Sequence, residues 1–430
     1  MEVREPSARY LTDDGTQRTE IGALPKDWSV VPLTLLAEKI MVGIASAATH
    51  AYRSTGVPMF RNQNIRPGLL DTQDVLYIDP QYEQTYKNKR LKAGDLLTAR
   101  TGYPGTTSLV PAGLDGAQSF TTLITRPRPG SIDPQYLCLY INGRAGQRYF
   151  EQAQIGGGQK NVNAASLKLL PVALPSTDTE QRAIARALID ADGLIHALEQ
   201  LLTKKRQIKL GAMQELLTGK RRLPGFVKRW NEVKLRQLGN FLKGSGIKRE
   251  EALSGDLPCV RYGEIYTTHS DYIRRFSSWI SPAVASSATL LHQGDLLFAG
   301  SGETKVEIGK CVAFLEERPA YAGGDIVILR PTVDADSMYL GYLLNTPGAA
   351  RQKASKGQGD AVVHISANSL GEVEVVLPEP SEQAAIAKVL FDIDGELADL
   401  EARLTKARAL KQGMAQALLT GRIRLVEPTQ

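Results

Sequence analysis

The 430 residues exceed the length of one ordinary domain, so two domains of roughly 150 residues with connecting structure are expected. Hydrophobic residues make up 42% of the chain and charged residues 23%, which is the composition of an ordinary globular protein. The formal net charge of +6 favours a polyanionic partner, although a basic protein of any other kind carries such a charge equally well.

Cysteine usage and the N-terminal sequence narrow the class of protein further. Cys138, Cys259 and Cys311 show no Cys-x-x-Cys spacing, which argues against a disulfide framework or a structural zinc site and suits a reducing compartment. Residues 1–15 lack the apolar core of a signal peptide, and no stretch approaches about 18 uninterrupted apolar residues. We therefore expect a cytoplasmic protein without a membrane span.

Two segments predict globular domains of mixed α and β structure, residues 1–173 and residues 223–376. In the first, short apolar runs predict strands and one longer run predicts a helix: strands at 95–100, 122–125 and 169–174, and a helix at 134–154. The second echoes these elements at 295–298, 326–329, 336–345 and 373–377. An α+β fold is the expected class.

Polar segments, some of them rich in glycine, follow several of these strands. Glycine lets a backbone approach a phosphate closely, and Arg, Lys, Gln and Asn supply hydrogen bonds to base edges. Each segment alone is compatible with a surface turn, but three of them recur at matching places in both halves, which favours DNA binding. The candidate DNA contacts are Arg61, Asn62, Asn64, Arg100, Tyr103, Gln159, Lys160 and Asn161 in the first half, and Arg261, Tyr262, Ser301, Glu303, Lys305, Lys356, Gln358 and His364 in the second.

Residues 174–222 and 377–430 each predict one long helix. Pro with Ser, Thr, Asp or Glu marks each start, and Thr-Gly followed by basic residues marks each end. Apolar residues recur at spacings of four and three, the pattern of a coiled-coil seam. The seam residues are Ile184, Leu188, Ile195, Leu198 and Leu202 in the first helix, and Ile386, Leu390, Ile393, Leu397, Leu400 and Leu404 in the second. The stripe then steps to Ile208 and to Leu410, a shift that moves it around the helix toward a second packing partner.

Residues 180–223 and 382–425 are copies of one segment, with 24 of 44 positions identical at a constant offset of 202. Trp28 matches Trp230 at the same offset, and Gly-Asp-Leu-Leu occurs at both 94–97 and 294–297. The chain is therefore a duplication. We expect two similar globular domains in a pseudo-two-fold arrangement, separated by two long helices packed as an antiparallel coiled coil. The alternative is that the helices only close a core.

Motifs of common enzyme classes are missing. There is no Gly-x-x-x-x-Gly-Lys phosphate loop and no Gly-x-Ser-x-Gly elbow, and the five histidines form no zinc pattern. Residues 79–82 and 133–136, both Asp-Pro-Gln-Tyr, approach the Asp/Asn-Pro-Pro-Tyr loop of adenine methyltransferases but carry Gln where the second Pro belongs. Asp-Pro is also a common helix start, which is the interpretation we favour. We expect no catalytic residue and no metal site.

The chain strongly resembles the specificity subunit of type I restriction–modification systems over nearly its whole length. The residues that carry the resemblance are Glu20-Ile-Gly22, Leu24-Pro25 and Trp28, their echo from Leu223 to Trp230, the Gly-Asp-Leu-Leu loops, Gln159–Val162, and the two helices that run from Glu-Gln to Leu-Leu-Thr-Gly. Each loop motif alone is weakly specific for the family, but their two-fold arrangement is specific.

The resemblance implies that 1–173 and 223–376 are target-recognition domains, each reading one half of a bipartite, asymmetric site in double-stranded DNA. It implies that 174–222 and 377–430 are spacer helices that set the gap and dock two methyltransferase subunits, with motor-nuclease subunits joining for cleavage. S-adenosylmethionine would be held by the methyltransferase subunit, and this chain would bind no cofactor. Because residues 361–365 replace Gln159–Val162 in the second half, the two domains should read different sequences.

Two other classes of protein remain open from the sequence. A coiled-coil adaptor would bind proteins only, and the paired donor-rich segments speak against it. A self-contained DNA methyltransferase would bind S-adenosylmethionine itself, and the missing motifs speak against that.

Overall fold

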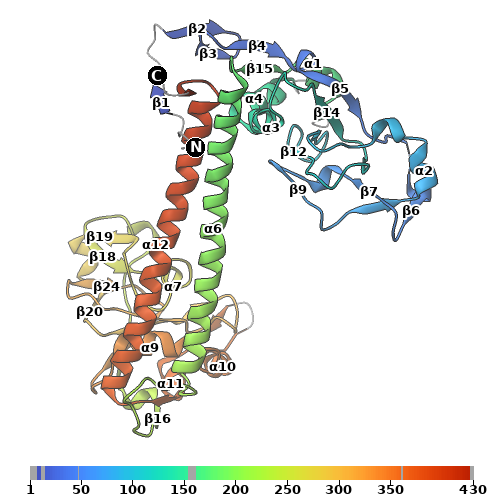
Figure 1. Cartoon of the computed structure of the whole chain (residues 1–430). Coiled ribbons are helices and arrows are strands. Elements are labelled where there is room, and N and C mark those ends of the chain that lie inside the picture. The colour runs from blue at the N-terminus through green and yellow to red at the C-terminus, as the bar shows by residue number, and fades with distance from the viewer. Residues whose placement is uncertain (1–6, 11–14, 47, 154–160, 360–361, 427–430) are drawn as a thin grey trace. The chain divides into compact units, whose positions relative to one another are not determined.

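The computed structural model describes residues 7–10, 15–46, 48–153, 161–359 and 362–426 (Figure 1). Residues 1–198 and 403–430 form one compact unit, unit 1, and residues 199–402 form unit 2. Each unit contains one globular part and a portion of each of two long helices. In the part of the chain that the structure describes, no helix is long and apolar enough to cross a membrane.

Two four-stranded sheets build the globular part of unit 1, in the orders β12-β11-β14-β5 and β13-β7-β10-β6. Leu96 and Leu123 are fully buried in the core shared with the helices, whereas Leu97 and Ile124 are fully buried in a second core that includes Phe60. The central strands are therefore covered on both faces, which explains their continuous apolar sequence. The strands are β5 (Ala37–Val42), β6 (Tyr52–Arg53), β7 (Val57–Phe60), β10 (Leu76–Ile78), β11 (Leu96–Thr98), β12 (Thr107–Leu109), β13 (Gln118–Ser119) and β14 (Leu123–Pro127).

Unit 2 repeats the first sheet strand for strand, in the order β17-β25-β21-β23. Its second sheet, β19-β18-β24-β20, keeps three of the strands but differs in the fourth, because β20 pairs with β24 whereas β6 of unit 1 pairs with β10. The two halves thus share an architecture and diverge in the second sheet. The strands are β17 (Gly239–Lys243), β18 (Leu257–Val260), β19 (Ser278–Ile280), β20 (Thr289–Leu291), β21 (Leu296–Ala299), β23 (Cys311–Ala313), β24 (Ala320–Ala322) and β25 (Ile326–Pro331).

Short helices and strand pairs complete the units. Unit 1 has β1 (Ser7–Tyr10) with β28 (Ile423–Val426), β2 (Thr16–Thr19) with β3 (Gly22–Pro25), β4 (Ser29–Pro32) with β15 (Pro171–Leu174), β8 (Ile65–Arg66) with β9 (Leu69–Leu70), α1 (Leu33–Leu36), α2 (Pro80–Gln84), α3 (Pro134–Asn142), α4 (Arg144–Ala153) and α5 (Ala164–Lys168). Unit 2 has β16 (Asn231–Lys234) with β27 (Glu374–Leu377), β22 (Ser301–Gly302) with β26 (Val363–His364), α7 (Tyr262–Thr267), α8 (Pro282–Ala285), α9 (Ser337–Leu344), α10 (Pro347–Lys356) and α11 (Ala367–Gly371). The helix predicted at 134–154 is thus two helices, separated at Gly143.

Both Asp-Pro-Gln-Tyr segments start helices. The Asp79 carboxylate accepts hydrogen bonds from the backbone N–H groups of Gln81 and Tyr82 at the start of α2. The Asp133 carboxylate accepts one from Tyr136 at the start of α3. An N-cap acceptor followed by proline at the first helical position is a regular helix start, as the sequence predicts.

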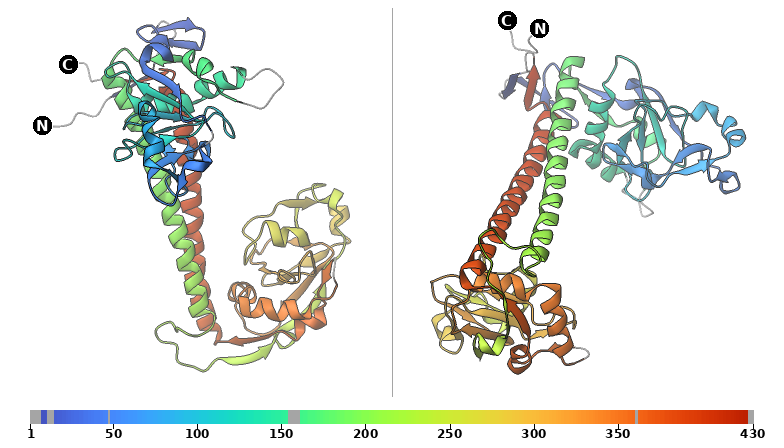
Figure 2. Two further views of the ribbon diagram at one scale, coloured as in Figure 1. Left: turned by 90° about the vertical axis from the view of Figure 1, so that its right-hand side faces the viewer. Right: turned by 60° about the horizontal axis from the view of Figure 1, so that its bottom comes forward.

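The long helices are α6 (Asp178–Leu216) and α12 (Pro380–Leu418), which lie side by side in both views of Figure 2. In unit 1, Lys411 of α12 pairs with Asp192 of α6 at 2.5 Å. In unit 2, Arg206 of α6 pairs with Glu401 of α12 at 2.7 Å. Later residues of α6 meet earlier residues of α12, so the pairing is antiparallel, as predicted.

The seam residues have two structural roles. Ile184 and Leu188 are buried in the core of the first globular part, and Ile386 and Leu390 in that of the second. The seam residues farther along the two helices are all buried or half-buried: Ile195, Leu198, Leu202, Ile393, Leu397, Leu400 and Leu404. The first turns of each helix therefore close a globular core, and the rest of the seam continues along the helix pair.

Candidate nucleic-acid interface

In unit 2 the structure brings the two glycine-containing segments together. Ser301 and Gly302 in β22 pair antiparallel with His364 and Val363 in β26. Gln358 exchanges backbone hydrogen bonds of 2.9 and 2.8 Å with His364, and the Ser301 hydroxyl lies 2.9 Å from Nδ1 of the His364 ring. Three predicted residues thus share one surface, on which the Gln358 and His364 side chains are exposed and Ser301 is buried.

A tyrosine that the sequence analysis did not select holds this surface in place. The Tyr266 hydroxyl donates a hydrogen bond to the Ser301 carbonyl at 3.1 Å. A Cβ atom on Gly302 would lie 2.7 Å from the same hydroxyl, so glycine is needed here for packing. The glycine that suggested close approach of a phosphate makes room for Tyr266. No local sequence pattern reveals this contact, because it spans 35 residues.

Arg261 and Tyr262 stand at the start of α7. The Arg261 guanidinium pairs with the buried Glu264 carboxylate at 3.0 Å, while the Tyr262 ring is exposed. A hollow of about 500 Å³ beside them is also lined by Arg249 and Asp325. A carboxylate partner orients a guanidinium, which then presents a fixed edge of donors to a ligand.

The remaining predicted residues of unit 2 lie on the loop after β22 and at the end of α10. Glu303 and Lys305 are exposed after β22, and Lys356 is half-buried at the end of α10. The sequence analysis missed Lys353. Its buried amine donates a hydrogen bond to the Gly309 carbonyl at 2.5 Å and anchors the far end of the loop after β22. Burial lowers the pKa of Lys353 to about 8.

In unit 1, Asn62 links two predicted segments. Its side-chain oxygen accepts a hydrogen bond from the Arg100 backbone N–H at 2.8 Å, and its amide donates to the Thr121 hydroxyl at 3.3 Å. The Arg61 guanidinium pairs with Asp74 at 3.0 Å. Within the described residues, the buried Nε atoms of Arg61 and Arg100 have no hydrogen-bond partner, so these donors remain for water or a ligand.

Asn64 requires a correction. Its side chain is buried, its amide donates to the carbonyls of Asp71 at 3.2 Å and Asp74 at 2.8 Å, and its oxygen accepts from the Arg61 backbone N–H at 2.8 Å. These bonds shape the loop that follows. We therefore withdraw Asn64 from the candidate DNA contacts, because its polar groups serve the backbone of its own turn.

The loop from Arg100 to Gly105 exposes Tyr103, whose side chain is 76% accessible. The Val162 backbone N–H donates to the Arg100 carbonyl at 3.1 Å, which places the exposed Asn161 beside this loop. Unit 2 has the same contact at the matching position, where Ile365 donates to the Gly300 carbonyl at 2.9 Å. The predicted residues Gln159 and Lys160 lie outside the described residues.

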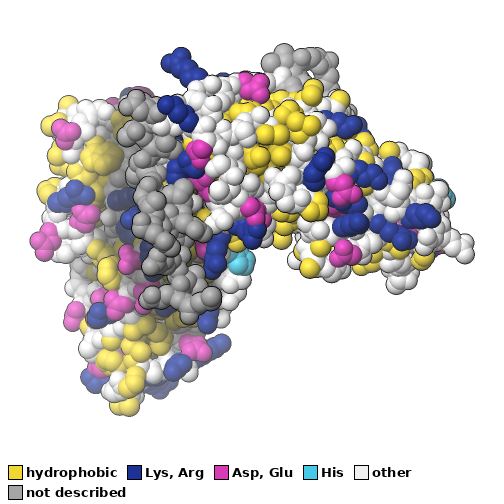
Figure 3. Space-filling view, turned by 45° about the horizontal axis from the view of Figure 1, so that its top comes forward, with side chains coloured by type: hydrophobic (Ala, Val, Ile, Leu, Met, Phe, Trp, Pro, Cys, Tyr) yellow, Lys and Arg dark blue, Asp and Glu magenta, His cyan; other side chains and the backbone are white. Residues whose placement is uncertain are grey.

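One surface of unit 1 is rich in charged side chains, and the three cysteine thiols are buried. On the face drawn in Figure 3, Lys and Arg side chains, with Asp and Glu among them, gather over the lobe of unit 1 that carries α2, β6 and β7. Burial raises the pKa values of Cys138, Cys259 and Cys311 to about 12, so none is a thiolate nucleophile at neutral pH. Over the ranges that the structure describes, no group of His, Cys, Asp and Glu could hold a metal ion.

The family model for the type I restriction modification DNA specificity domain matches residues 25–210 and 227–407. The two matches cover most of the chain, one in each half, and the chain belongs to this family of DNA specificity proteins. It is a type I restriction–modification specificity subunit, a component that recognises DNA and has no catalytic centre of its own.

Two curated relatives and one solved structure are similar to this chain along nearly its full length. The putative type I restriction enzyme MjaX specificity subunit of Methanocaldococcus jannaschii is 24% identical over 452 residues, covering 97% of this chain and 98% of the relative. The EcoKI specificity subunit of Escherichia coli strain K12 is 23% identical over 430 residues, covering 93% and 89%. The type I S subunit of M. genitalium has a similar fold, with a TM-score of 0.58, 16% identity, and coverage of 91% and 96%.

Proposed function

We propose that unit 1 and unit 2 each read one half of a bipartite, asymmetric DNA site. One observation carries the proposal: the same backbone contact, to Arg100 in one unit and Gly300 in the other, presents different side chains. In unit 1, Tyr103 and Asn161 are exposed beside this contact, and in unit 2, His364 and Gln358 are exposed beside it. A shared scaffold with different polar side chains is what two half-sites of different sequence require.

The gap between the half-sites is set, in this proposal, by α6 and α12. Both helices contribute residues to both units. Each has 39 residues, so each is about 58 Å long at 1.5 Å per residue. This is far beyond the mean helix length of about 11–12 residues and suits a spacer.

The helices also dock two copies of one methyltransferase subunit. Several residues that no core requires are identical and exposed in both repeats, which is expected if both repeats meet the same partner. These pairs are Thr203 and Thr405, Lys204 and Lys406, Gly211 and Gly413, and Gln214 and Gln416. Ile208 and Leu410 occupy matching positions among them, and their apolar side chains are 45% and 59% exposed.

The partner subunits hold S-adenosylmethionine and carry out methylation, and motor-nuclease subunits join the complex for cleavage. This chain itself binds no cofactor. Its work is done on genomic DNA in the cytoplasm.

Methylation mapping in cells that carry this chain with its methyltransferase partner tests the proposal. The expected result is one modified motif of two short, different sequences separated by a fixed unspecified gap. A continuous motif would contradict the two-unit arrangement. Unmodified DNA, together with no sequence preference of the purified complex, would favour the protein-only adaptor.

A further inference from the structure

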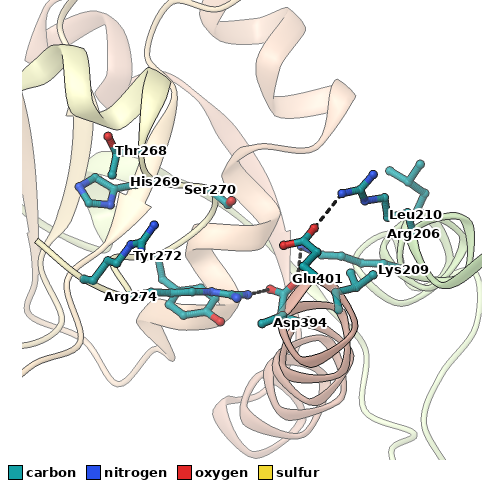
Figure 4. A pocket seen from close by; sticks show the side chains of 13 residues that line it. Arg206, Lys209, Leu210, Thr268, His269, Ser270, Tyr272, Arg274, Asp394 and Glu401 are labelled. Atoms are coloured by element: carbon teal, nitrogen blue, oxygen red, sulfur yellow. Dashed lines mark hydrogen bonds and ion pairs between the residues drawn. The ribbon is translucent and has the colours of Figure 1, made fainter. Parts of the chain in front are cut away.

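A hollow of about 750 Å³ lies in unit 2 between the long helices and the loop 268–275 that follows α7 (Figure 4). Four cationic and two carboxylate side chains line it. The cationic side chains are Arg206, Lys209, Arg274 and Arg275, and the carboxylates are Asp394 and Glu401. The hollow contains none of the residues selected above for reading bases.

Asp394 links the elements that surround the hollow. Its carboxylate is only 4% exposed and meets Lys209 at 2.8 Å, Arg274 at 3.1 Å and the Tyr342 hydroxyl at 2.7 Å. Lys209 also pairs with Asp271 at 3.2 Å. These contacts fasten the loop to both helices and neutralise Lys209, so Asp394 and Lys209 form the floor of the site.

The arginines keep donors available at the rim. Arg206 pairs with Glu401 at 2.7 Å, but the two side chains are 58% and 53% exposed, and such a surface pair contributes little to stability. Arg274 contacts Asp394 through one nitrogen and is partly exposed. Arg275 is exposed and forms no hydrogen bond or ion pair with any residue that the structure describes. Guanidinium groups in this state are ready to bind a phosphate through paired N–H donors.

The wall of the hollow contains a further polar group without a protein partner. Nε2 of His269 is buried and has no hydrogen-bond partner among the described residues. A buried polar atom of this kind calls for water or a ligand.

A second hollow lies beside this one, next to the loop that carries Glu303 and Lys305. Ser270 lines both hollows, and the wall of the second includes Val306 and Ile308. Those residues directly follow the loop that carries Glu303 and Lys305, and α7 joins the first hollow to Arg261 and Tyr262. An extended polyanion in contact with the loop that carries Glu303 and Lys305 would therefore reach these arginines next.

We propose that Arg206, Arg274 and Arg275 bind backbone phosphates of the DNA beside the half-site that unit 2 reads. The inference rests on the proposed function and adds a sequence-independent phosphate clamp to it. Because phosphates are the same in every sequence, the clamp contributes affinity and salt dependence, and no base preference.

The test compares R275Q and the double variant R274Q/R275Q with R229Q, which removes the same charge from an exposed arginine outside the hollow. Binding of the complex with its methyltransferase subunits is measured on cognate and scrambled duplexes between 50 and 200 mM salt. The slope of log K against log salt should weaken by roughly 0.9 for each lost contact. The loss of affinity between 50 and 200 mM salt should then be about 3.5-fold smaller per contact. Cognate and scrambled duplexes should lose affinity equally, and R229Q should behave as the unmodified chain.

An unchanged salt slope in both hollow variants would overturn the inference while leaving the proposed function intact, provided that the cognate preference persists. A changed base preference would also overturn it, because the arginines would then read bases. A free anion is distinguished by melting the DNA-free chain with inorganic phosphate at constant ionic strength. Stabilisation that R274Q/R275Q abolishes, together with unchanged DNA affinity, would assign the hollow to a small anion. Melting temperatures of the variants without phosphate verify that they fold.

Discussion

Trp28 donates a hydrogen bond from its indole Nε1 to the Glu180 carboxylate at 3.2 Å in unit 1. The Arg424 guanidinium completes the cluster, since it meets both Glu180 oxygens at 2.6 and 2.7 Å and lies over the Trp28 ring at 5.7 Å. Glu180 stands in the first turn of α6, and Arg424 follows the end of α12. The cluster therefore ties the start of one long helix to the end of the other.

Unit 2 contains the same cluster. Trp230 donates to Glu382 at 3.2 Å, and Arg222 meets both Glu382 oxygens at 2.5 and 2.6 Å and lies over the Trp230 ring at 5.5 Å. Arg222 follows the end of α6, and Glu382 stands in the first turn of α12. The duplication has thus conserved a tie between helix ends in each unit.

E180Q should destabilise unit 1 by on the order of 3 kcal/mol, because the half-buried Arg424 loses one charged partner and, among the described residues, retains Asp27 at 2.8 Å as its other. Hydrogen exchange followed by mass spectrometry resolves the two units. Faster exchange is expected in β4 and β15, with unit 2 unaffected. E382Q is the matched variant and should loosen β16 and β27 instead. Equal effects of either change on both units would show that the clusters do not act locally.

H364A should relax the half-site read by unit 2. The β22–β26 pairing is made by the backbone and survives the substitution, so the expected effect is loss of a base contact, worth about 1–3 kcal/mol of discrimination. Methylation mapping should show degenerate bases in one half of the motif only. Y103A provides the comparison, since this exposed side chain lies in unit 1 and should affect the other half alone. Degenerate bases in both halves of the motif for either variant would contradict the assignment of one half-site to each unit.

The duplication made much of the fold accessible from the sequence. Repeated segments mark equivalent structural positions, and the seam spacing identifies two paired helices. Asp95 and Asp295, for example, lie in matching loops and form the same two-pronged ion pair, with Arg126 and Arg330, at 2.7 Å. The repeat identifies the two aspartates as equivalent, whereas their arginine partners lie 31 and 35 positions away and are not revealed by a local pattern.

The candidate site was less accessible because its geometry depends on distant contacts. Asn64 reads as a donor in the sequence, but its bonding to Asp71 and Asp74 appears only when the turn closes. The hollow in unit 2 needs Arg206 and Arg274 to meet across 68 positions of sequence. No periodicity or motif encodes such a meeting.

Matched insertions of seven residues after Gln200 and after Ala402 should widen the gap in the recognised site. A heptad preserves the apolar seam, and the two points lie opposite each other in the antiparallel pair. Each insertion adds about 10 Å of helix, close to three base pairs at 3.4 Å each. Methylation mapping should recover both half-sites unchanged with a longer gap. Altered half-sites at the original gap would rule out a ruler role for the helices.

I208E and L410E should each remove one methyltransferase subunit from the complex. Both side chains are exposed, so a carboxylate costs the fold little, but it would be buried without a partner at a protein interface. Mass measurement of the purified complex should show one partner copy with either variant and none with the double variant. L201E is the control, because this exposed leucine has an arginine, Arg403, at the matching position. Full occupancy in the double variant would place the docking surface elsewhere.

K353M should change how the stability of unit 2 depends on pH. Burial lowers the folded-state pKa of Lys353 from 10.5 to about 8, so between these values the unfolded chain holds a proton that the folded chain has released. Stability of the unmodified protein therefore rises as pH increases through this window, and the cost of the buried charge is fully present below pH 8. Relative to K353M, the unmodified protein should gain about 2–3 kcal/mol between pH 7 and pH 10.

Urea unfolding at both pH values, followed by tryptophan fluorescence, measures this difference, since Trp230 and Trp279 lie in unit 2. K356M is the control, because it removes a lysine from the same helix and leaves Lys353 in place. A parallel pH dependence of K353M and the unmodified protein would mean that the Lys353 amine keeps its proton when folded. The loop that carries Ser301 would then be anchored at Gly309 by an ammonium group throughout the neutral and alkaline range.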